Sequence, residues 1–266
     1  MRKVLITGAG SGLGEGTAIG LAKLGHDVIA TAQTWPQVTA LREKVRSLGI
    51  KTLSVEKFDI LDTYDAAHTL KFDFDILVNN AGIGEGGPIS EIPVDLVRSN
   101  FETNVFSTLD FTQRVVRKWV AEGVRGKVVF ISSIVGLVSV APVPAYAASK
   151  HALQSMAETM YGELKSFGIQ VQTINPGPFL TGFNESMVEA GLRWLNDDVN
   201  FVKRAVFQSG ADALLGKPEG RLDPNDMIAK MVEVIPSSEG KFLNVFPPSN
   251  EEWAKIYQQQ LYDLTI

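Results

Sequence analysis

Short apolar runs alternate with amphipathic stretches along most of the chain. Runs of five to seven residues have the length and composition of buried strands: Lys3–Thr7, Asp27–Ala32, Thr52–Phe58, Asp75–Asn79, Lys127–Ser132, Gln170–Asn175 and Lys241–Phe246. Helical spacing of apolar residues predicts helices that start near Leu13 and Gln37 and over Val94–Ala121 and Tyr146–Phe167, with Gly25, Gly49 and Gly168 placed to end three of them. Such strand–helix units predict an α/β fold, a doubly wound parallel seven-stranded sheet with helices on both faces.

One region departs from this alternation. Residues 178–222 predict no regular element, and we interpret them as an insertion over one end of the sheet. No repeat, low-complexity tract or linker separates a second domain, and the length of 266 residues and the apolar fraction of 45% suit one large domain. We therefore expect residues 1–266 to form a single domain.

Composition removes several classes of function. The net charge is −5 and no long basic run is present, which argues against a nucleic-acid partner. The absence of cysteine excludes disulfides, a thiol nucleophile and thiolate metal ligands. His26, His68 and His151 lack metal-ligand spacing, so no metal site is predicted.

The longest uncharged stretch, Val128–Ser149, is interrupted by Ser132, Gly136 and Pro142, so we predict a strand and a loop there rather than a membrane span. The N-terminal apolar run is followed by glycines instead of a cleavage site and is interpreted as the first strand. A cytoplasmic protein without a membrane partner is expected.

A glycine-rich stretch, Thr7–Gly14, lies between the first strand and the first helix. Glycines there let the backbone approach a pyrophosphate, which meets the N–H groups and positive end of the helix. The spacing of Gly8, Gly12 and Gly14 is GxxxGxG and not GxGxxG. A tight turn built from small residues is the alternative.

Polar or turn residues follow four further strands. Asp59 follows the third strand, Asn79-Asn80-Ala81-Gly82 ends the fourth, Ser132 and Ser133 end the fifth, and Pro176-Gly177-Pro178 ends the sixth. Asn–Asn can be only a turn former, and Asp59 can cap the following turn or reach an adenine amino group. Because the carboxyl ends of parallel strands line the ligand crevice, the five segments together predict a site at this edge.

Tyr146 and Lys150 stand four residues apart in a predicted helix, which turns through about 400° over that distance and brings both to one face. An ammonium beside a phenol favours phenolate and lowers the tyrosine pKa toward the range of a general acid or base. A packed ring beside a solvated amine is the alternative for the pair alone.

These motifs, in this order, resemble the short-chain dehydrogenase/reductase family over residues 3 to about 181. The resemblance rests on TGAGSGLG from Thr7, NNAG from Asn79, Ser133, YAASK from Tyr146 and PGPFLT from Pro176. It implies a Rossmann fold and an oxidoreductase that transfers hydride between a nicotinamide and a carbonyl or alcohol carbon. The stretch from Ser149 to Phe183 is similar to the branch with 17β-hydroxysteroid and retinol dehydrogenases.

The resemblance also implies residue roles. Tyr146 matches the general acid/base and Ser133 the serine that holds the carbonyl oxygen, while Lys150 matches the ribose-binding residue that lowers the tyrosine pKa and Asn104 the asparagine of a proton relay. The cofactor contacts carried over, together with those that the rim motifs indicate, are Gly8, Ser11, Gly12, Leu13, Gly14, Gln33, Asp59, Ile60, Asn80, Ala81, Gly82, Tyr146, Lys150, Pro176, Gly177 and Thr181.

Two departures from the family pattern stand out. The helix between Asp59 and Asp75 is short, which alters one flank of the adenine end. The C-terminal part lacks the TGxxxxVDGG-like ending of members that reduce acyl-carrier substrates, which argues against 3-oxoacyl reduction.

The end of the second strand bears on the choice of cofactor. The strand ends in Ala32-Gln33-Thr34, without the acidic residue that repels a 2′-phosphate in NAD-specific members. Neither an arginine at position 33 nor a basic residue at Ser11 supplies the usual phosphate clamp, although Gln33, Thr34 and Ser11 can donate neutral hydrogen bonds. We predict that NADP(H) is accepted and modestly preferred, with NAD(H) the alternative.

Bulky apolar residues gather in the insertion: Phe179, Phe183, Met187, Leu192, Trp194, Phe201 and Phe207. They predict a lid over a bulky apolar carbonyl or alcohol, and packing of the insertion against the body is the alternative. The two long helices carry apolar residues at helical spacing, Phe101, Val105, Leu109, Met156 and Met160, and the resemblance implies that such helices pair into a homodimer or homotetramer.

Two other functions are possible on this scaffold. A dinucleotide-binding sensor without turnover would be expected to lose catalytic positions first, and none of the four is missing. An epimerase or dehydratase would bring an additional acid or base, which the sequence does not identify.

Overall fold

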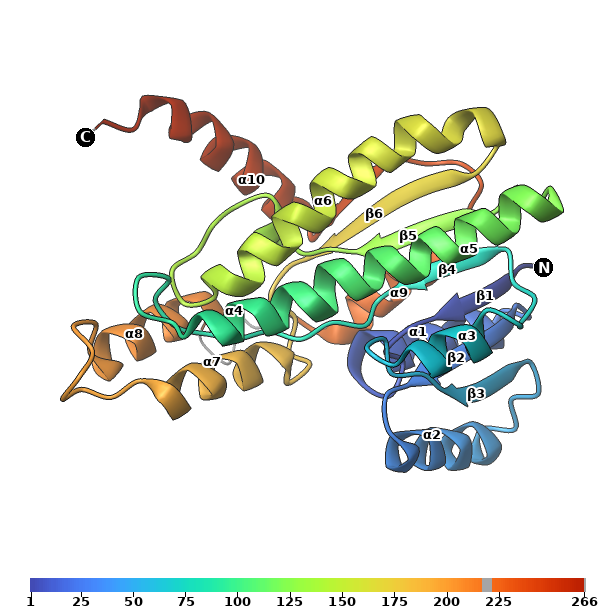
Figure 1. Cartoon of the computed structure of the whole chain (residues 1–266), viewed down its shortest axis with the longest axis horizontal. Helices are drawn as coiled ribbons and strands as arrows, with labels where there is room; N and C mark the ends of the chain where they lie inside the picture. Colours follow the sequence, from blue (N-terminus) through green and yellow to red (C-terminus); the bar gives the residue numbers. More distant parts are fainter. Residues whose placement is uncertain (217–221, 266) are drawn as a thin grey trace.

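A seven-stranded sheet forms the centre of the computed structural model, which describes residues 1–216 and 222–265 (Figure 1). The strand order is β3-β2-β1-β4-β5-β6-β7 and every pairing is parallel. The strands are β1 Lys3–Ile6, β2 Asp27–Ala32, β3 Leu53–Lys57, β4 Ile76–Asn79, β5 Lys127–Ile131, β6 Gln170–Pro176 and β7 Leu243–Phe246. The predicted doubly wound seven-stranded sheet is confirmed. The strand order runs outward from β1 to β3 on one side and from β4 to β7 on the other, so the topological switch point lies between β1 and β4. Open α/β sheets bind their ligands at this point.

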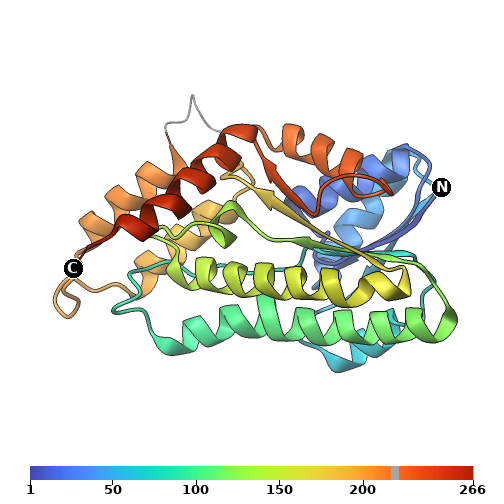
Figure 2. The ribbon, with the colours of Figure 1, turned by 90° about the horizontal axis from the view of Figure 1, so that it is seen from above.

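Helices cover both faces of the sheet because each face is a continuous apolar surface (Figures 1 and 2). Buried residues of α1, α2 and α9 pack on one face, and buried residues of α3, α5 and α6 pack on the other. The α-helices are α1 Gly12–Lys23, α2 Trp35–Ser47, α3 Thr63–Thr69, α4 Val94–Phe101, α5 Thr108–Glu122, α6 Pro144–Leu164, α7 Phe183–Trp194, α8 Arg204–Leu215, α9 Pro224–Val234 and α10 Pro248–Gln260. Gly25, Gly49 and Gly168 follow α1, α2 and the α6 region with positive φ, as predicted.

The long helix predicted over Val94–Ala121 contains one irregular turn. Residues Glu102–Ser107 form a π-helical segment, η1, between α4 and α5. Such segments insert an extra residue into a helix and occur often at functional sites. The segment includes Asn104.

The segment 178–222 was predicted to hold no regular element, and this was wrong. It contains α7 and α8, which bury Met187, Val188 and Phe207. Helix packing against a distant part of the chain stabilises these two elements, which is a tertiary effect that local pattern does not show. Residues 217–221 of this segment lie outside the described residues.

None of the helices described is both long enough and apolar enough to cross a membrane. The uncharged stretch Val128–Ser149 forms most of β5, the short 3-10 helix Ile134–Gly136, a loop and the first turns of α6.

Candidate functional site

A cleft of about 630 Å³ lies at the carboxyl ends of β1, β4, β5 and β6. Of the predicted site residues, the structure brings all but Asn104 to its walls: Gly8, Ser11, Gly12, Leu13, Gly14, Gln33, Asp59, Ile60, Asn80, Ala81, Gly82, Ser133, Tyr146, Lys150, Pro176, Gly177 and Thr181. Segments that are far apart in sequence therefore meet in one cleft.

Hydrogen bonds join the glycine-rich loop after β1 to the loop after β4. The Thr7 hydroxyl accepts from the backbone N–H groups of Asn80 and Ala81, each at 3.0 Å. The Asn80 amide donates to the carbonyl oxygens of Thr7 and Gly8, each at 2.9 Å. A Cβ at Gly8 would lie 2.6 Å from the Ala81 Cα, and the φ of Gly8 is +64°, so only glycine fits there.

This joined loop leads directly into α1, whose first turn lines the cleft with Gly12, Leu13 and Gly14. The unpaired N–H groups of a helix N-terminus attract anions. The residues present therefore fit the pyrophosphate of a dinucleotide at the start of α1.

Three side chains meet at the other end of the cleft. Tyr146 and Lys150 project from α6, and the Lys150 Nζ lies 5.5 Å from the centre of the Tyr146 ring. Ser133, which follows β5, is hydrogen-bonded to the Tyr146 hydroxyl. The Lys150 ammonium donates to the carbonyl oxygen of Ile131 at 2.8 Å, which fixes the lysine against β5.

Burial sets the titration of this group. It raises the pKa of Tyr146 well above its ordinary value, and the hydrogen bond with Ser133 acts in the opposite direction. Burial lowers the pKa of Lys150 to about 8. Because burial raises its pKa, the Tyr146 phenol is protonated in this environment and suited to donate a proton. The lowering of the Tyr146 pKa by Lys150 stays a prediction.

Asn104 lies behind the cleft on the π-helical segment. Its Oδ1 accepts from the Ile83 N–H, and its Nδ2 donates to the Ile83 carbonyl and the Ser149 hydroxyl, each at 2.9 Å. A Cβ at Gly82 would lie 3.1 Å from the Asn104 Oδ1 and 3.7 Å from the Lys150 Nζ. Asn104 therefore holds the loop after β4 against α6.

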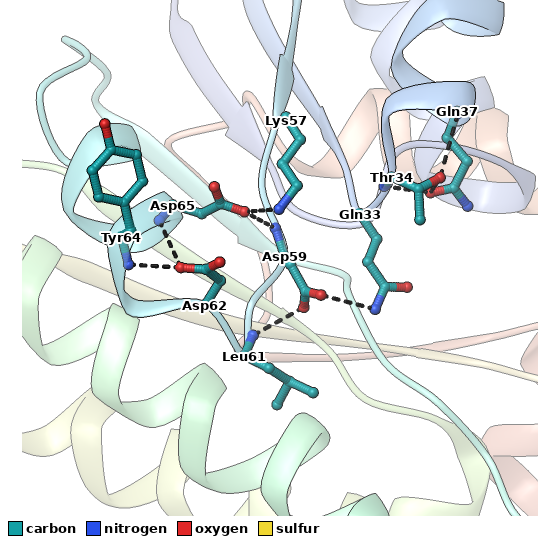
Figure 3. Close-up of polar contacts among 9 residues, drawn as sticks. All are labelled: Gln33, Thr34, Gln37, Lys57, Asp59, Leu61, Asp62, Tyr64 and Asp65. Carbon is teal, nitrogen blue, oxygen red and sulfur yellow. Dashed lines mark hydrogen bonds and ion pairs between the residues drawn. The ribbon is translucent and has the colours of Figure 1, made fainter.

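Gln33 and Asp59 also line the cleft. Figure 3 shows the polar contacts of these two residues. The Gln33 amide donates to the Asp59 carboxylate at 3.2 Å, and the other oxygen of that carboxylate accepts from the Leu61 N–H at 3.1 Å. Thr34 caps α2 and exchanges hydrogen bonds with Gln37. Asp59 therefore both caps its turn, as one alternative predicted, and faces the cleft.

A family model described as short chain dehydrogenase matches residues 2–191. The chain belongs to the short-chain dehydrogenase family. It is 33% identical to the uncharacterised oxidoreductase YusZ of Bacillus subtilis over 183 residues, which cover 66% of the chain and 65% of YusZ. It is 32% identical to human retinol dehydrogenase 8 over 193 residues, which cover 70% of the chain and 62% of that relative.

Solved structures of short-chain dehydrogenases share the whole fold. One from Burkholderia phymatum in complex with NAD superposes with a TM-score of 0.81 at 22% identity and covers 100% of the chain and 98% of its own. A gluconate 5-dehydrogenase from Burkholderia cenocepacia in complex with NADP and tartrate has a TM-score of 0.71 at 25% identity, covering 88% of each chain. Nicotinamide dinucleotides thus occupy related structures.

The bulky residues of the insertion divide into three groups in this short-chain dehydrogenase. Phe179 and Phe183 line the cleft, and the Phe183 ring lies 5.4 Å from the Tyr146 ring. Met187, Leu192, Trp194 and Phe207 pack within the protein, and Phe201 is exposed. The packing alternative is correct for most of them.

Sequence reasoning missed two residues that shape the site. Thr7 joins the two loops described above, and Asn175 on β6 donates to the Ser133 carbonyl at 2.9 Å. Asn175 is fully buried and also donates to Gln154. β6 also contains Gln170, Gln172 and Thr173, so its pattern did not single out Asn175, and Thr7 was visible only as the first letter of the glycine-rich motif.

Proposed function

We propose that this protein is an NAD(P)(H)-dependent oxidoreductase that interconverts a carbonyl and a secondary or primary alcohol. The observation that carries the proposal is the convergence of Ser133, Tyr146 and Lys150 at one end of a cleft whose other end suits a dinucleotide. Membership of a family of dehydrogenases and reductases supports it.

The bound nicotinamide supplies or accepts the hydride, and the protein supplies orientation and proton transfer. In reduction, the Ser133 hydroxyl donates a hydrogen bond to the carbonyl oxygen. The Tyr146 O–H bond breaks as its proton moves to that oxygen, which becomes the alcohol while the carbonyl carbon gains the hydride. The Lys150 ammonium stabilises the phenolate left behind. A proton from solvent then restores the phenol, through a relay that Asn104 supports by holding the loop after β4 against α6.

A replacement at Tyr146 tests this mechanism. Tyr146→Phe keeps the buried ring but removes the transferable proton, so turnover should fall at least about 100-fold, the contribution expected of general acid–base catalysis. NAD(P)H absorbance with a panel of ketones and alcohols gives the measurement. Full turnover by the variant on a confirmed substrate would contradict the mechanism, and no turnover by the wild type with either cofactor would favour a non-catalytic dinucleotide-binding protein.

NADP(H) is proposed as the modestly preferred cofactor, with NAD(H) the close alternative. The part of the cleft around Asp59 has neutral hydrogen-bond donors on Gln33, Gln37 and Ser11. Asp59 is the single carboxylate among the described lining residues. The Gln33 amide donates to Asp59. Gln33→Arg should place a positive charge at this position, bind a 2′-phosphate through charge-assisted hydrogen bonds and raise the NADP preference. A wild-type kcat/KM that favours NAD(H) beyond about tenfold would overturn the proposal.

A bulky apolar substrate fits the Phe179 and Phe183 rings and Ile83 at the catalytic end. The name of retinol dehydrogenase 8 points in the same direction. Turnover of small charged keto acids alone would argue against this class.

The remaining proposals concern organisation. We infer a single dinucleotide-binding domain over residues 1–266, located in the cytoplasm, and a homodimer or homotetramer. Val105 and Met160 are buried and Leu109 and Met156 are partly buried in the core, so they serve the sheet, whereas Phe106 on η1 and Tyr161 on α6 are exposed. Sedimentation at micromolar concentration showing only a 28.9 kDa species would count against an oligomer.

A further inference from the structure

The α7–α8 segment, residues 183–215, rests on the loop that follows β4. The Trp194 indole N–H donates to the Gly86 carbonyl at 3.1 Å. A Cβ on Gly87 would lie 2.1 Å from the Trp194 ring, so the ring packs directly on the backbone of the loop. Met187 lies against Gly84 in the same way. α7 is therefore docked on residues 84–87 from Met187 to Trp194.

A second connection lies farther along the same loop, at Glu91. One carboxylate oxygen accepts from the Phe201 N–H at 2.8 Å and from the Asn200 amide at 3.1 Å. The other oxygen accepts from the Val202 N–H at 2.8 Å. Both oxygens of one partly buried side chain thus bind the turn between α7 and α8, more than 100 residues away in sequence.

These contacts need the ionised carboxylate. Burial acts to raise the pKa of Glu91, but hydrogen bonds from Val202, Phe201 and Asn200, together with the charge of Lys203, hold it below its ordinary value. The other charged residues on the elements that meet here are Glu85 on the same loop, Asp95 and Arg98 on α4, and Asp197, Asp198 and Arg204 around the turn. Burial raises the pKa of Glu85 above its ordinary value. Because the folded-state pKa is lowered, the stabilisation is present at neutral pH and is lost as the pH falls through that value.

The same segment forms part of the cleft. α7 begins with Phe183, whose ring lies against Tyr146, and continues with Asn184 and Ser186 on the cleft wall. α7 and α8 pack on each other through a separate small apolar cluster that includes Val188 and Phe207. Displacement of the turn between them would therefore move α7 and its cleft-lining residues.

We propose that Glu91 is a positioning residue that latches the α7–α8 segment to the loop after β4 and so holds Phe183 over the substrate end of the cleft. The reference to substrate rests on the proposed function. Glu91 itself touches neither Tyr146 nor the other proposed catalytic groups, so it should govern binding more than proton transfer.

The test compares Glu91→Gln with Glu189→Gln. Glu91→Gln keeps the size of the side chain but places an amide N–H₂ against backbone N–H donors. Glu189, on the exposed face of α7, pairs with Arg193 and provides the same substitution on the segment that Glu91 binds. Neither change alters an apolar contact of the core.

Hydrogen exchange of the Phe201 and Val202 amides should become about tenfold faster in Glu91→Gln, as expected for the loss of hydrogen bonds to a charged acceptor, and stay unchanged in Glu189→Gln. KM for the carbonyl substrate should rise about tenfold with kcat within about twofold, because uniform binding is lost. The wild-type KM should rise as the pH falls through the lowered pKa of Glu91. Glu91→Gln should show no such rise in KM. Glu91→Asp keeps a carboxylate and should show part of this pH-dependent rise.

Unchanged exchange at Phe201 and Val202 in Glu91→Gln would overturn the latch. Unchanged KM with faster exchange would also overturn it as a positioning device and leave Glu91 a purely structural contact. The exchange experiment requires no substrate, so failure of the proposed oxidoreductase activity would be seen separately, as absence of turnover by the wild type.

Discussion

Two buried lysines mark the two ends of β5 and differ in what they do. Lys127 is the first residue of the strand, and Lys150 binds the carbonyl of its last residue, Ile131. The exposed fractions are 3% and 4%, and burial lowers the pKa of each to about 8. None of the ion pairs among the described residues includes either lysine.

The difference lies in their hydrogen bonds. The Lys127 ammonium donates to the carbonyls of Val234, Ile235 and Ser237 at 3.1, 3.1 and 2.8 Å, which uses all three donors and caps the end of α9. The Lys150 ammonium makes one such bond and lines the cleft. Burial and a shifted pKa therefore do not identify a functional lysine. An ammonium that lines a cleft and has N–H donors not used by backbone carbonyls does.

The largest expected effect is on activity, at Lys150. Lys150→Met keeps the apolar stem and removes the charge that stabilises the Tyr146 phenolate, so kcat/KM should fall at least about 100-fold. The melting temperature should change little, because only one hydrogen bond is lost. Cofactor-dependent turnover and thermal melting measured on one preparation give both numbers. An active variant would remove Lys150 from the mechanism.

The same substitution at Lys127 should do the opposite. Lys127→Met leaves three buried or partly buried carbonyls without their donor and should lower the free energy of unfolding by about 3 kcal/mol. The folded fraction should keep its kcat/KM within about twofold, since Lys127 lies at the other end of the strand. Denaturant unfolding and kinetics below the transition provide the comparison. A large loss of activity without loss of stability would contradict the division of roles.

A smaller effect is expected from pH. Lys150 is charged below its pKa of about 8 and neutral above it, so kcat/KM for carbonyl reduction should decline as the pH rises through about 8, by up to about tenfold per unit. Lys127→Met should keep this decline. Lys150→Arg, which stays charged throughout, should move it to higher pH. A profile that is flat from pH 7 to 10 would show that the ammonium is not required.

The sheet and much of the site could be predicted because their signals are local. Each strand is a short apolar run, and the motif residues that follow it must meet at the carboxyl edge once the strands are parallel. Lys150 was found through its spacing from Tyr146. Lys127 resembled an ordinary residue at the start of a strand, because its three partners lie more than 100 residues away.

The remaining features depend on such distant contacts. α7 and α8 are stabilised by the loop after β4, and Glu91 gains its meaning only where that loop meets Phe201 and Val202. The π-helical turn at Asn104 adds a residue within a helix that the apolar spacing predicted to be continuous. The local sequence pattern does not show α7 and α8, the contacts of Glu91 or the π-helical turn.

Deuterium transfer tests the central claim most directly. The protein would be incubated with NAD(P)H in which both hydrogens at C4 of the nicotinamide are replaced by deuterium, and with a ketone found in the substrate screen. The account predicts deuterium on the carbinol carbon of the product, one atom for each cofactor oxidised, and almost none with Tyr146→Phe over the same time. Product without deuterium, or a changed substrate with no net cofactor oxidation, would contradict hydride transfer to a carbonyl and favour an epimerase or dehydratase on the same scaffold.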